Sequence, residues 1–449
     1  MKRTRVKIVA VKEEPGKPCW PCVDHDADKE LSRVTTPIVE LNPGMDFDVV
    51  SYTQLWQAEA DYEADVEKYD GILVLLMTCW KGIDKFYAAQ SKDGIPTIVA
   101  DVPYCGSGSM LLHTSPFVRE NKLPVPLLST LNYNEIAEAV RIFDVFAKLK
   151  QTRILVVTHN PDIRKKPLKP SINETCDSFT KEWGCEFITK EGADLLAYMD
   201  RADEAEAKAI ADRWISGADE VLEASRDEIV ESAKVHIALR EMMKDTGSQA
   251  VTVDCLSLSY NGAYGEQRHF YPCLSHFEML NNGTVAVCEA DIAATVTSLI
   301  VYYLTGRQGF VSDPVIDTSS NQIIYAHCVG CKKAHGCGDP LDCRYAIRSH
   351  SEDKRGASVQ IFFPLGEKLT TMMIYPNQQA ASVLHTSRAV GNVGHQEACR
   401  SKLAAEANAE KILNNWTGGW HRVTVFGDYR TLFLNLLKMK GLEVIQEDR

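Results

Sequence analysis

Apolar runs that alternate with helical patterns constrain the first two thirds of this chain most strongly. Gly71–Met77 is apolar at every position, which is typical of a strand covered on both faces. Shorter strand-like runs lie at Val6–Val11, Thr97–Ala100 and Arg153–Val157, and a long helical pattern covers Ala202–Lys244. Strands that alternate with helices predict parallel sheets.

The last third of the chain changes character, because strand-like runs follow one another there. These runs are Ile323–Ala326, Ser358–Phe363, Leu369–Ile374 and Arg422–Phe426. Consecutive strands favour a separate and mostly antiparallel domain. We therefore predict an α/β protein with two Rossmann-like, doubly wound α/β domains, followed by a mostly antiparallel β-barrel domain. The predicted domains are residues 1–150, 151–309 and 310–449.

Charge and hydropathy narrow the class of function. The 449 residues carry a net charge of −12, which argues against a general binder of nucleic acid or of anionic membranes. The longest apolar run, Ala293–Leu304, is shorter than the roughly 20 residues of a membrane span. The first residues contain no run that fits a signal peptide. The 14 cysteines therefore suggest free thiols, and we expect a cytoplasmic enzyme that handles small molecules.

Two carboxylates lie at positions where an α/β fold places its ligands. Glu289 follows a strand-like segment and precedes an apolar helix, and Asp313 comes after that helix. The helix between them can return the chain so that both side chains meet at the edge of the sheet. The alternative is structural: Glu289 caps the helix, and Asp313 forms a turn before Pro314.

Three histidines are candidate ligands or binding residues. His421 precedes a strand and follows a glycine pair, His327 ends another strand, and His350 precedes a third. Neutral imidazole binds divalent metals well. A single histidine is nevertheless more often a structural residue, so each position allows both interpretations.

The cysteines offer two competing motifs. Cys19 and Cys22 form a C-x-x-C pair, which is typical of thiol redox chemistry when a helix follows it. The segment Cys328–Cys343 contains four cysteines and is a candidate for structural zinc, although its spacing differs from that of zinc ribbons. Free thiols in a functional loop are the simpler interpretation.

Several segments, in this order along the chain, resemble the superfamily of L-fucose and L-arabinose isomerases. They are Tyr271-Pro-Cys-Leu-Ser-His276, Asn281-Asn-Gly-Thr284, Val287-Cys-Glu-Ala-Asp291, Gly306–Asp313, Ala326-His-Cys328 and Gly418-Gly-Trp-His421. The resemblance is specific over about residues 260–330 and at the last histidine, and only architectural over residues 1–250.

The resemblance implies a divalent metal, usually Mn²⁺, with Mg²⁺ or Co²⁺ as alternatives. It implies that Glu289, Asp313 and His421 bind this metal. Arabinose isomerases add a histidine at the position of His327, whereas fucose isomerases do not. The resemblance further implies a homo-oligomer of three to six subunits whose active sites are shared between subunits.

The implied reaction is the interconversion of an aldose and a ketose through a cis-enediol. Glu289 and Asp313 then act as the acid–base pair, because a proton must move between two adjacent carbons. We expect Trp20, His327 and His350 to contact the sugar. A hexose, a pentose, a deoxysugar and an anionic sugar all remain open. The alternatives are a thiol redox or zinc protein and a sugar-binding protein without turnover.

Overall fold

The computed structural model describes residues 2–14, 16–17, 22, 24–92, 94–159, 161–162, 170–260, 270–376, 379–394 and 397–449. Contacts within the chain define two compact units. Unit 1 comprises Met1–Lys148 and Thr431–Glu443, and unit 2 comprises Leu149–Arg430 and Val444–Arg449. Trp20 and Cys19, which the sequence analysis singled out, lie outside the described residues.

Unit 1 contains a parallel five-stranded sheet in the order β2-β1-β3-β4-β5. Its strands are β1 (Thr4–Val11), β2 (Met45–Tyr52), β3 (Gly71–Leu76), β4 (Thr97–Asp101) and β5 (Leu127–Ser129). The predicted apolar strand is confirmed, since every residue of β3 is buried. The helical elements are α1 (Ala27–Glu40), α2 (Leu55–Lys68), α3 (Ile83–Gln90), α4 (Ser107–Ser109), η1 (Met110–Thr114), α5 (Ser115–Glu120), α6 (Tyr133–Ala139), α7 (Arg141–Leu149) and most of α16 (Arg430–Lys440).

Unit 2 begins with a second parallel sheet, in the order β10-β9-β6-β7. Its strands are β6 (Arg153–Val157), β7 (Glu186–Lys190), β9 (Ala250–Val253) and β10 (Val285–Cys288). Its helices are α8 (Ile172–Trp183), α9 (Gly192–Met199), α10 (Glu204–Gly217), α11 (Arg226–Thr246), α12 (Cys255–Tyr260), α13 (Cys273–Asn281) and α14 (Ile292–Thr305). The long helical pattern divides into α10 and α11 because Ser225 and Glu228 form a capping box that starts α11.

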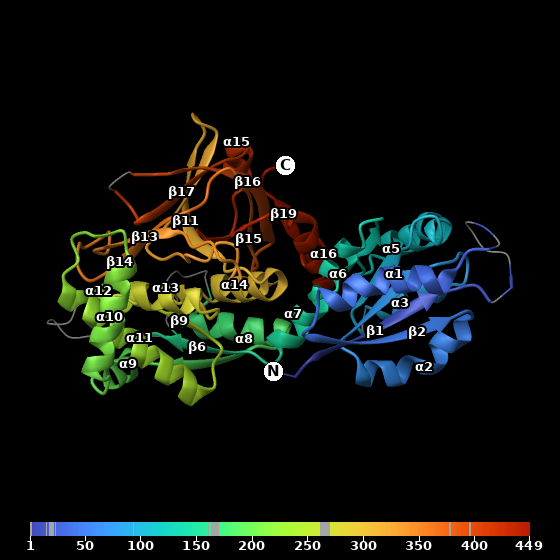
Figure 1. The fold of residues 1–449 in the computed structure, drawn as a ribbon, viewed down its shortest axis with the longest axis horizontal. Coiled ribbons are helices and arrows are strands. Elements are labelled where there is room, and N and C mark those ends of the chain that lie inside the picture. The colour runs from blue at the N-terminus through green and yellow to red at the C-terminus, as the bar shows by residue number, and fades with distance from the viewer. Residues whose placement is uncertain are drawn as a thin grey trace. The chain divides into compact units, whose positions relative to one another are not determined.

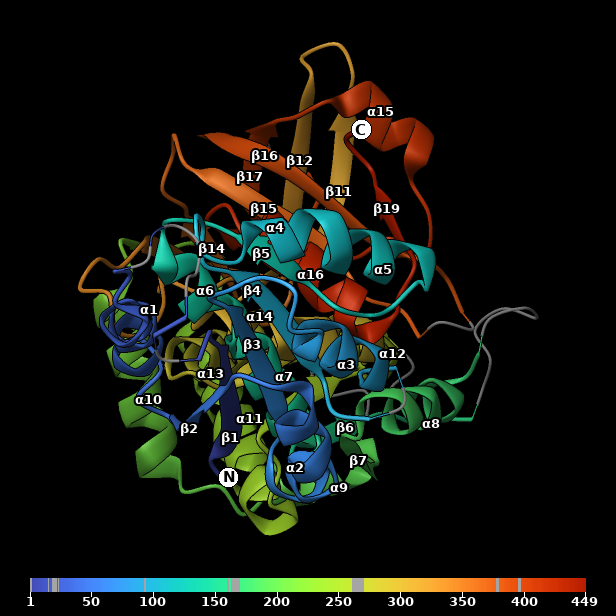
Figure 2. The ribbon, with the colours of Figure 1, turned by 90° about the vertical axis from the view of Figure 1, so that its right-hand side faces the viewer.

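The last third of the chain forms a closed antiparallel barrel. Six strands pair in the order β15-β18-β11-β12-β17-β16, and β16 pairs back to β15. They are β11 (Phe310–Asp317), β12 (Gln322–His327), β15 (Lys368–Met373), β16 (Ser382–Asn392), β17 (Ser401–Glu406) and β18 (Arg422–Phe426). Strand β19 (Val444–Gln446) adds to β16, and β13 (Arg344–Arg348) and β14 (Ser358–Phe362) form a smaller sheet with β8 (Glu220–Val221). Figures 1 and 2 show the barrel strands together with α15 (Ala409–Asn415) at their rim.

Helix α14 joins the two layers of unit 2. It contacts β9 and β10 of the parallel sheet as well as β11, β15 and β18 of the barrel. In Figure 1, α13 and α14 lie between these two layers. Most residues of α14 are buried, which fits its apolar sequence. This helix is therefore held between the parallel sheet and the barrel.

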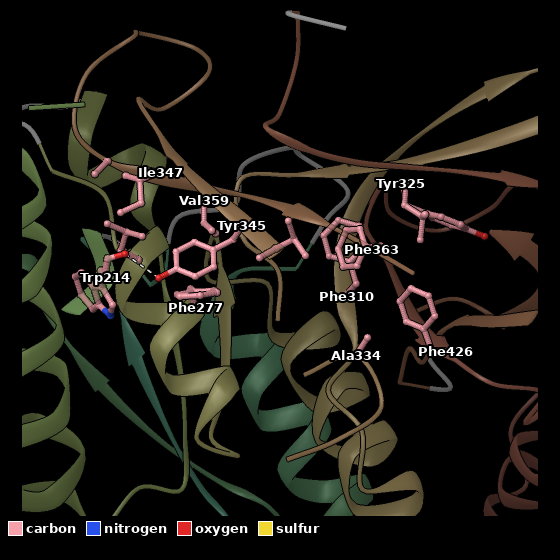
Figure 3. Packing of buried hydrophobic residues seen from close by; sticks show 14 of the residues in the cluster. Trp214, Phe277, Phe310, Tyr325, Ala334, Tyr345, Ile347, Val359, Phe363 and Phe426 are labelled. Carbon is pink, nitrogen blue, oxygen red and sulfur yellow. Dashed lines mark hydrogen bonds between the residues drawn. The ribbon is translucent and has the colours of Figure 1, made fainter. Parts of the chain in front are cut away.

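A large apolar cluster fills the interior on the barrel side of unit 2. It includes Phe277 of α13, Phe310 of β11 and Phe363 after β14, and Phe310 packs against Phe363 with ring centroids 4.8 Å apart (Figure 3). The Tyr345 hydroxyl donates a 2.8 Å hydrogen bond to the carbonyl of Trp214. This packing fixes β11, which carries Asp313.

The observed architecture is a mixed α/β protein with parallel sheets and a closed six-stranded antiparallel barrel. The alternation of strands and helices and the later change to antiparallel strands are thus confirmed at this level. Of the helices formed by the described residues, none has the length and apolar character needed to cross a membrane.

Candidate metal centre

Four side chains from separate parts of unit 2 meet at one point. Their donor atoms, from Glu289, Asp313, His327 and His421, all lie within 4.8 Å of one another. Glu289 follows β10, Asp313 lies in β11, His327 ends β12, and His421 directly precedes β18. The sequence predicted the first carboxylate, the second carboxylate and the last histidine as ligands, and left the role of His327 open.

Strand pairing explains why the three barrel residues meet. In the β11–β12 ladder Asp313 pairs with Ala326, the neighbour of His327. In the β11–β18 ladder Ser312, the neighbour of Asp313, pairs with Arg422, which follows His421. The register of three adjacent strands therefore brings all three donors to one end of the barrel.

Glu289 reaches the same point through an unusual backbone. Glu289 and Ala290 both have positive φ, at 64° and 47°. Residues other than glycine rarely adopt this conformation, and each instance costs about 1–3 kcal/mol. The Ala290 amide donates a 3.1 Å hydrogen bond to the carbonyl of Val253 on β9, which holds the junction in place. Glu289 thus lies in the tight turn that connects β10 to α14.

Three of the separations between donor atoms fit a shared cation. Nε2 of His421 lies 3.4 Å from Oδ1 of Asp313 and 3.9 Å from Oε2 of Glu289. Nε2 of His327 lies 3.9 Å from Oε1 of Glu289. Two donors that each bind one ion at about 2.1 Å are at most about 4.2 Å apart. These three separations are all within that limit.

The two imidazoles provide a further test of the fit. Nε2 of His327 and Nε2 of His421 are buried, and neither has a hydrogen-bond partner. An unpaired buried nitrogen is costly, because it gives up hydrogen bonds to water and gains none. A divalent ion bound by both nitrogens and by the two carboxylates removes this cost. The residues present therefore fit a metal such as Mn²⁺, for which carboxylate and imidazole are suitable ligands.

A third carboxylate, Asp291, contacts His421 at the ring nitrogen that faces away from the other donors. Its Oδ2 accepts a 2.8 Å hydrogen bond from Nδ1 of His421, and its Oδ1 accepts a 2.8 Å bond from the amide of Ala294. Asp291 is thus the N-cap of α14, which rules out the structural alternative in which Glu289 caps this helix. The alternative of a turn at Asp313 is ruled out as well, because Asp313 lies inside β11 and pairs with Ala326.

Charges within the cluster shift the pKa values of its members. Burial opposes protonation of His421, but the hydrogen bond and the charge of Asp291 outweigh it and raise the pKa of His421 to about 9. Burial, assisted by nearby acidic groups such as Asp291, raises the pKa of Asp313, and the nearby His421 opposes this. Burial, assisted by the charge of His421, lowers the pKa of His327. The acidic groups around His421 are therefore the cause of its raised pKa.

The remaining predicted residues lie outside this group of four. His350 is buried and stacks on Tyr271 with ring centroids 3.8 Å apart. Across the residues that the structure covers, no second group of possible ligands is found, and Cys328–Cys343 forms none. Cys22 is exposed, and its C-x-x-C partner Cys19 falls outside the described part of the chain.

The sequence analysis gave no role to Asp291, although this residue lies in one of the motifs that carry the resemblance. The available signal was an aspartate directly before an apolar helix, which is a strong N-cap pattern. Nothing in the sequence indicates that its second oxygen reaches a histidine 130 residues later. That contact depends on the packing of α14 against β18.

The fold and the site together define a mixed α/β protein with a candidate metal centre. Comparison with known proteins adds no family: no family model and no curated protein matches this chain. One solved chain, described as a two-component system response regulator/GGDEF domain protein, is 14% identical. The match covers 55% of this chain and 81% of that chain, and its TM-score of 0.25 is too low to support an argument.

Proposed function

We propose that this protein is a metal-dependent isomerase that interconverts an aldose and a ketose through a cis-enediol of a free sugar. The observation that carries the proposal is the set of two carboxylates and two unpaired imidazole nitrogens around one point. The same residues carry the resemblance to the L-fucose and L-arabinose isomerases. Mn²⁺ is the proposed cofactor, with Mg²⁺ or Co²⁺ as alternatives.

The bound metal would supply the positive charge that polarises a sugar carbonyl and stabilises the enediolate. Glu289 is the most open of the four residues, with 32% of its side chain exposed, whereas Asp313 has 16% exposed. Glu289 can therefore meet a substrate that enters from solvent. We assign Glu289 and Asp313 as the acid–base pair, in which one carboxyl group removes a proton from one carbon and the other delivers to the next a proton that exchanges with solvent.

His421 and His327 are positioned by the barrel strands β18 and β12. In this proposal they bind the metal and contribute no proton to the transfer between the two carbons. Their rings are nearly inaccessible, with 6% of each side chain exposed. Burial keeps bulk water away from these two ligands, which strengthens electrostatic interactions at the site. His350 and Trp20 remain proposed contacts of the sugar.

The finer architecture also belongs to this proposal. We infer that the two parallel sheets are Rossmann-like, doubly wound domains, because the order β2-β1-β3-β4-β5 matches one common doubly wound order. The proposed division at residues 150 and 310 follows from the change in strand and helix pattern along the sequence. The shared sites of a homo-oligomer follow from the resemblance. The reducing, cytoplasmic location expected from the 14 cysteines and the apolar pattern of the sequence also belongs to this proposal.

Turnover in deuterated water tests the proposal. The protein loaded with Mn²⁺ is incubated with a panel of aldoses, and the ketose products are analysed for deuterium on the carbon that receives the proton. We expect at least one aldose to give a labelled ketose. Conversion without any label would refute the enediol route, and sugar binding without conversion would favour a binding protein.

Variants separate the roles of the two carboxylates. Glu289→Gln and Asp313→Asn keep the shape of each side chain but remove the base, so we expect turnover to be lost in both. Glu406→Gln is the matched control, because Glu406 lies at the exposed end of β17. Full activity in either site variant would reject the role assigned to that residue.

A further inference from the structure

We propose that Asp291 is a positioning residue that fixes His421 with its Nε2 directed to the metal. This inference rests on the metal site of the proposed function, but it does not depend on the identity of the sugar. It assigns a function to a carboxylate that does not belong to the four donors.

The hydrogen bond between Asp291 and His421 determines which nitrogen can bind a metal. Nδ1 lies 2.8 Å from Oδ2 of Asp291, and an ionised carboxylate only accepts hydrogen bonds. Nδ1 must therefore carry the proton. A neutral imidazole carries one proton, so the lone pair is then on Nε2, the atom that faces Asp313 and Glu289.

Asp291 itself is held rigidly by its second oxygen. Oδ1 accepts from the amide of Ala294 in the first turn of α14, and this helix contacts both the parallel sheet and the barrel. The backbone carbonyl of His421 is also fixed, since it accepts a 3.0 Å hydrogen bond from Nη1 of the buried Arg422. The ring and its partner thus have little freedom, as metal ligands require of their outer partners.

The capping role and the positioning role can be separated by substitution. Asp, Asn and Ser are all strong N-caps, so Asn or Ser at position 291 is expected to preserve the start of α14. Asparagine whose oxygen caps the helix presents an NH₂ group to Nδ1, which must then accept. The ring proton moves to Nε2 and blocks the metal, whereas serine leaves Nδ1 without a protein partner.

The experiment measures the affinity for Mn²⁺ by isothermal titration calorimetry, together with unfolding of the metal-free protein. We expect Asp291→Asn to bind Mn²⁺ about 10–100-fold more weakly than the wild type. We expect the Mn²⁺ affinity of Asp291→Ser to lie between those of the wild type and Asp291→Asn. Asp291→Glu keeps a carboxylate, so we expect it to bind Mn²⁺ more tightly than Asp291→Asn. A role in capping alone predicts no difference among the wild type, Asn and Ser.

A matched control is available in the same unit. Asp203 caps α10 through a 2.7 Å hydrogen bond from the amide of Glu206 and lies outside the metal site. Asp203→Asn should leave the affinity for Mn²⁺ unchanged. Equal affinity of the wild type and Asp291→Asn would overturn the inference. Tight Mn²⁺ binding that depends on Asp291, without turnover of any sugar, would refute the isomerase and leave the inference intact.

Discussion

A buried charge network next to His421 allows a quantitative prediction about stability. Glu447 and Arg422 are both fully buried, and Nη2 of Arg422 donates a 2.6 Å hydrogen bond to Oε1 of Glu447. The other oxygen of Glu447 lies 2.8 Å from Nδ1 of His385. We predict that Glu447→Gln destabilises the protein by about 3–5 kcal/mol, because a buried ion pair that loses one partner leaves an uncompensated charge.

The geometry explains why glutamine cannot restore the lost charge. Glu447 accepts hydrogen bonds at both oxygens, from Arg422 and from His385. An amide has only one oxygen, so its NH₂ group must face one of the two donors. The guanidinium of Arg422 keeps its bonds to the carbonyls of Gly419, His421 and Thr417, but these are neutral acceptors. The positive charge therefore stays buried without a counter-charge.

Unfolding in guanidinium chloride, followed by tryptophan fluorescence and circular dichroism, measures the change in free energy. Glu406→Gln, at an exposed position of β17, should change the free energy of unfolding by no more than about 0.5 kcal/mol. Replacing both members, as in Arg422→Met with Glu447→Leu, should cost less than Glu447→Gln alone. A loss below about 1 kcal/mol for Glu447→Gln would show that the carboxylate does not compensate Arg422.

Four further predictions concern metal, catalysis and pH. Glu289→Gln and Asp313→Asn should each lower kcat by at least about 10²-fold, measured on a sugar that the wild type converts. His327→Ala should weaken Mn²⁺ binding at least about tenfold by calorimetry, and unchanged affinity would remove His327 from the ligand set. Removing metal with a chelator should lower the free energy of unfolding, and Mn²⁺ at about 100 times its Kd should restore about 2.7 kcal/mol. Burial opposes ionisation of Glu447, but its hydrogen bonds to His385 and Arg422 outweigh this effect and lower its pKa. The stability that Glu447 contributes is therefore complete above its pKa in the unfolded chain, and it is lost as the pH falls through the lower pKa of the folded protein. Measuring the free energy of unfolding of the wild type and Glu447→Gln across the acidic range checks this direction.

The sequence predicted those parts of the fold that depend on local pattern. The apolar run of β3 is fully buried, and the strand-like run at residues 422–426 is β18. The grouping of residues 431–443 with unit 1 was not predicted. It depends on contacts between residues far apart in the chain, and the local pattern of α16 indicates only a helix.

The candidate site shows the same division between local and distant information. Glu289, Asp313 and His421 were selected from motifs in their order along the chain, and the structure brings their donor atoms together. Both Glu289 and Asp291 precede the same helix, and the sequence analysis considered only Glu289 as its cap. In the structure Asp291, which directly precedes Ile292, is the N-cap of α14, whereas Glu289 lies two residues earlier, where φ is 64°.

Several costly features surround this one point, and together they argue for a function there. Glu289 and Ala290 hold strained backbone conformations, at about 1–3 kcal/mol each. Two buried imidazole nitrogens have no hydrogen-bond partner, and the acidic groups of Glu289 and Asp313 face the same space. A junction that served only to connect β10 to α14 would gain stability from apolar residues and a glycine at the turn. A bound divalent cation would compensate both the nitrogens that lack hydrogen bonds and the repulsion between the two carboxylates. These unfavourable features are therefore the ones expected of a metal centre.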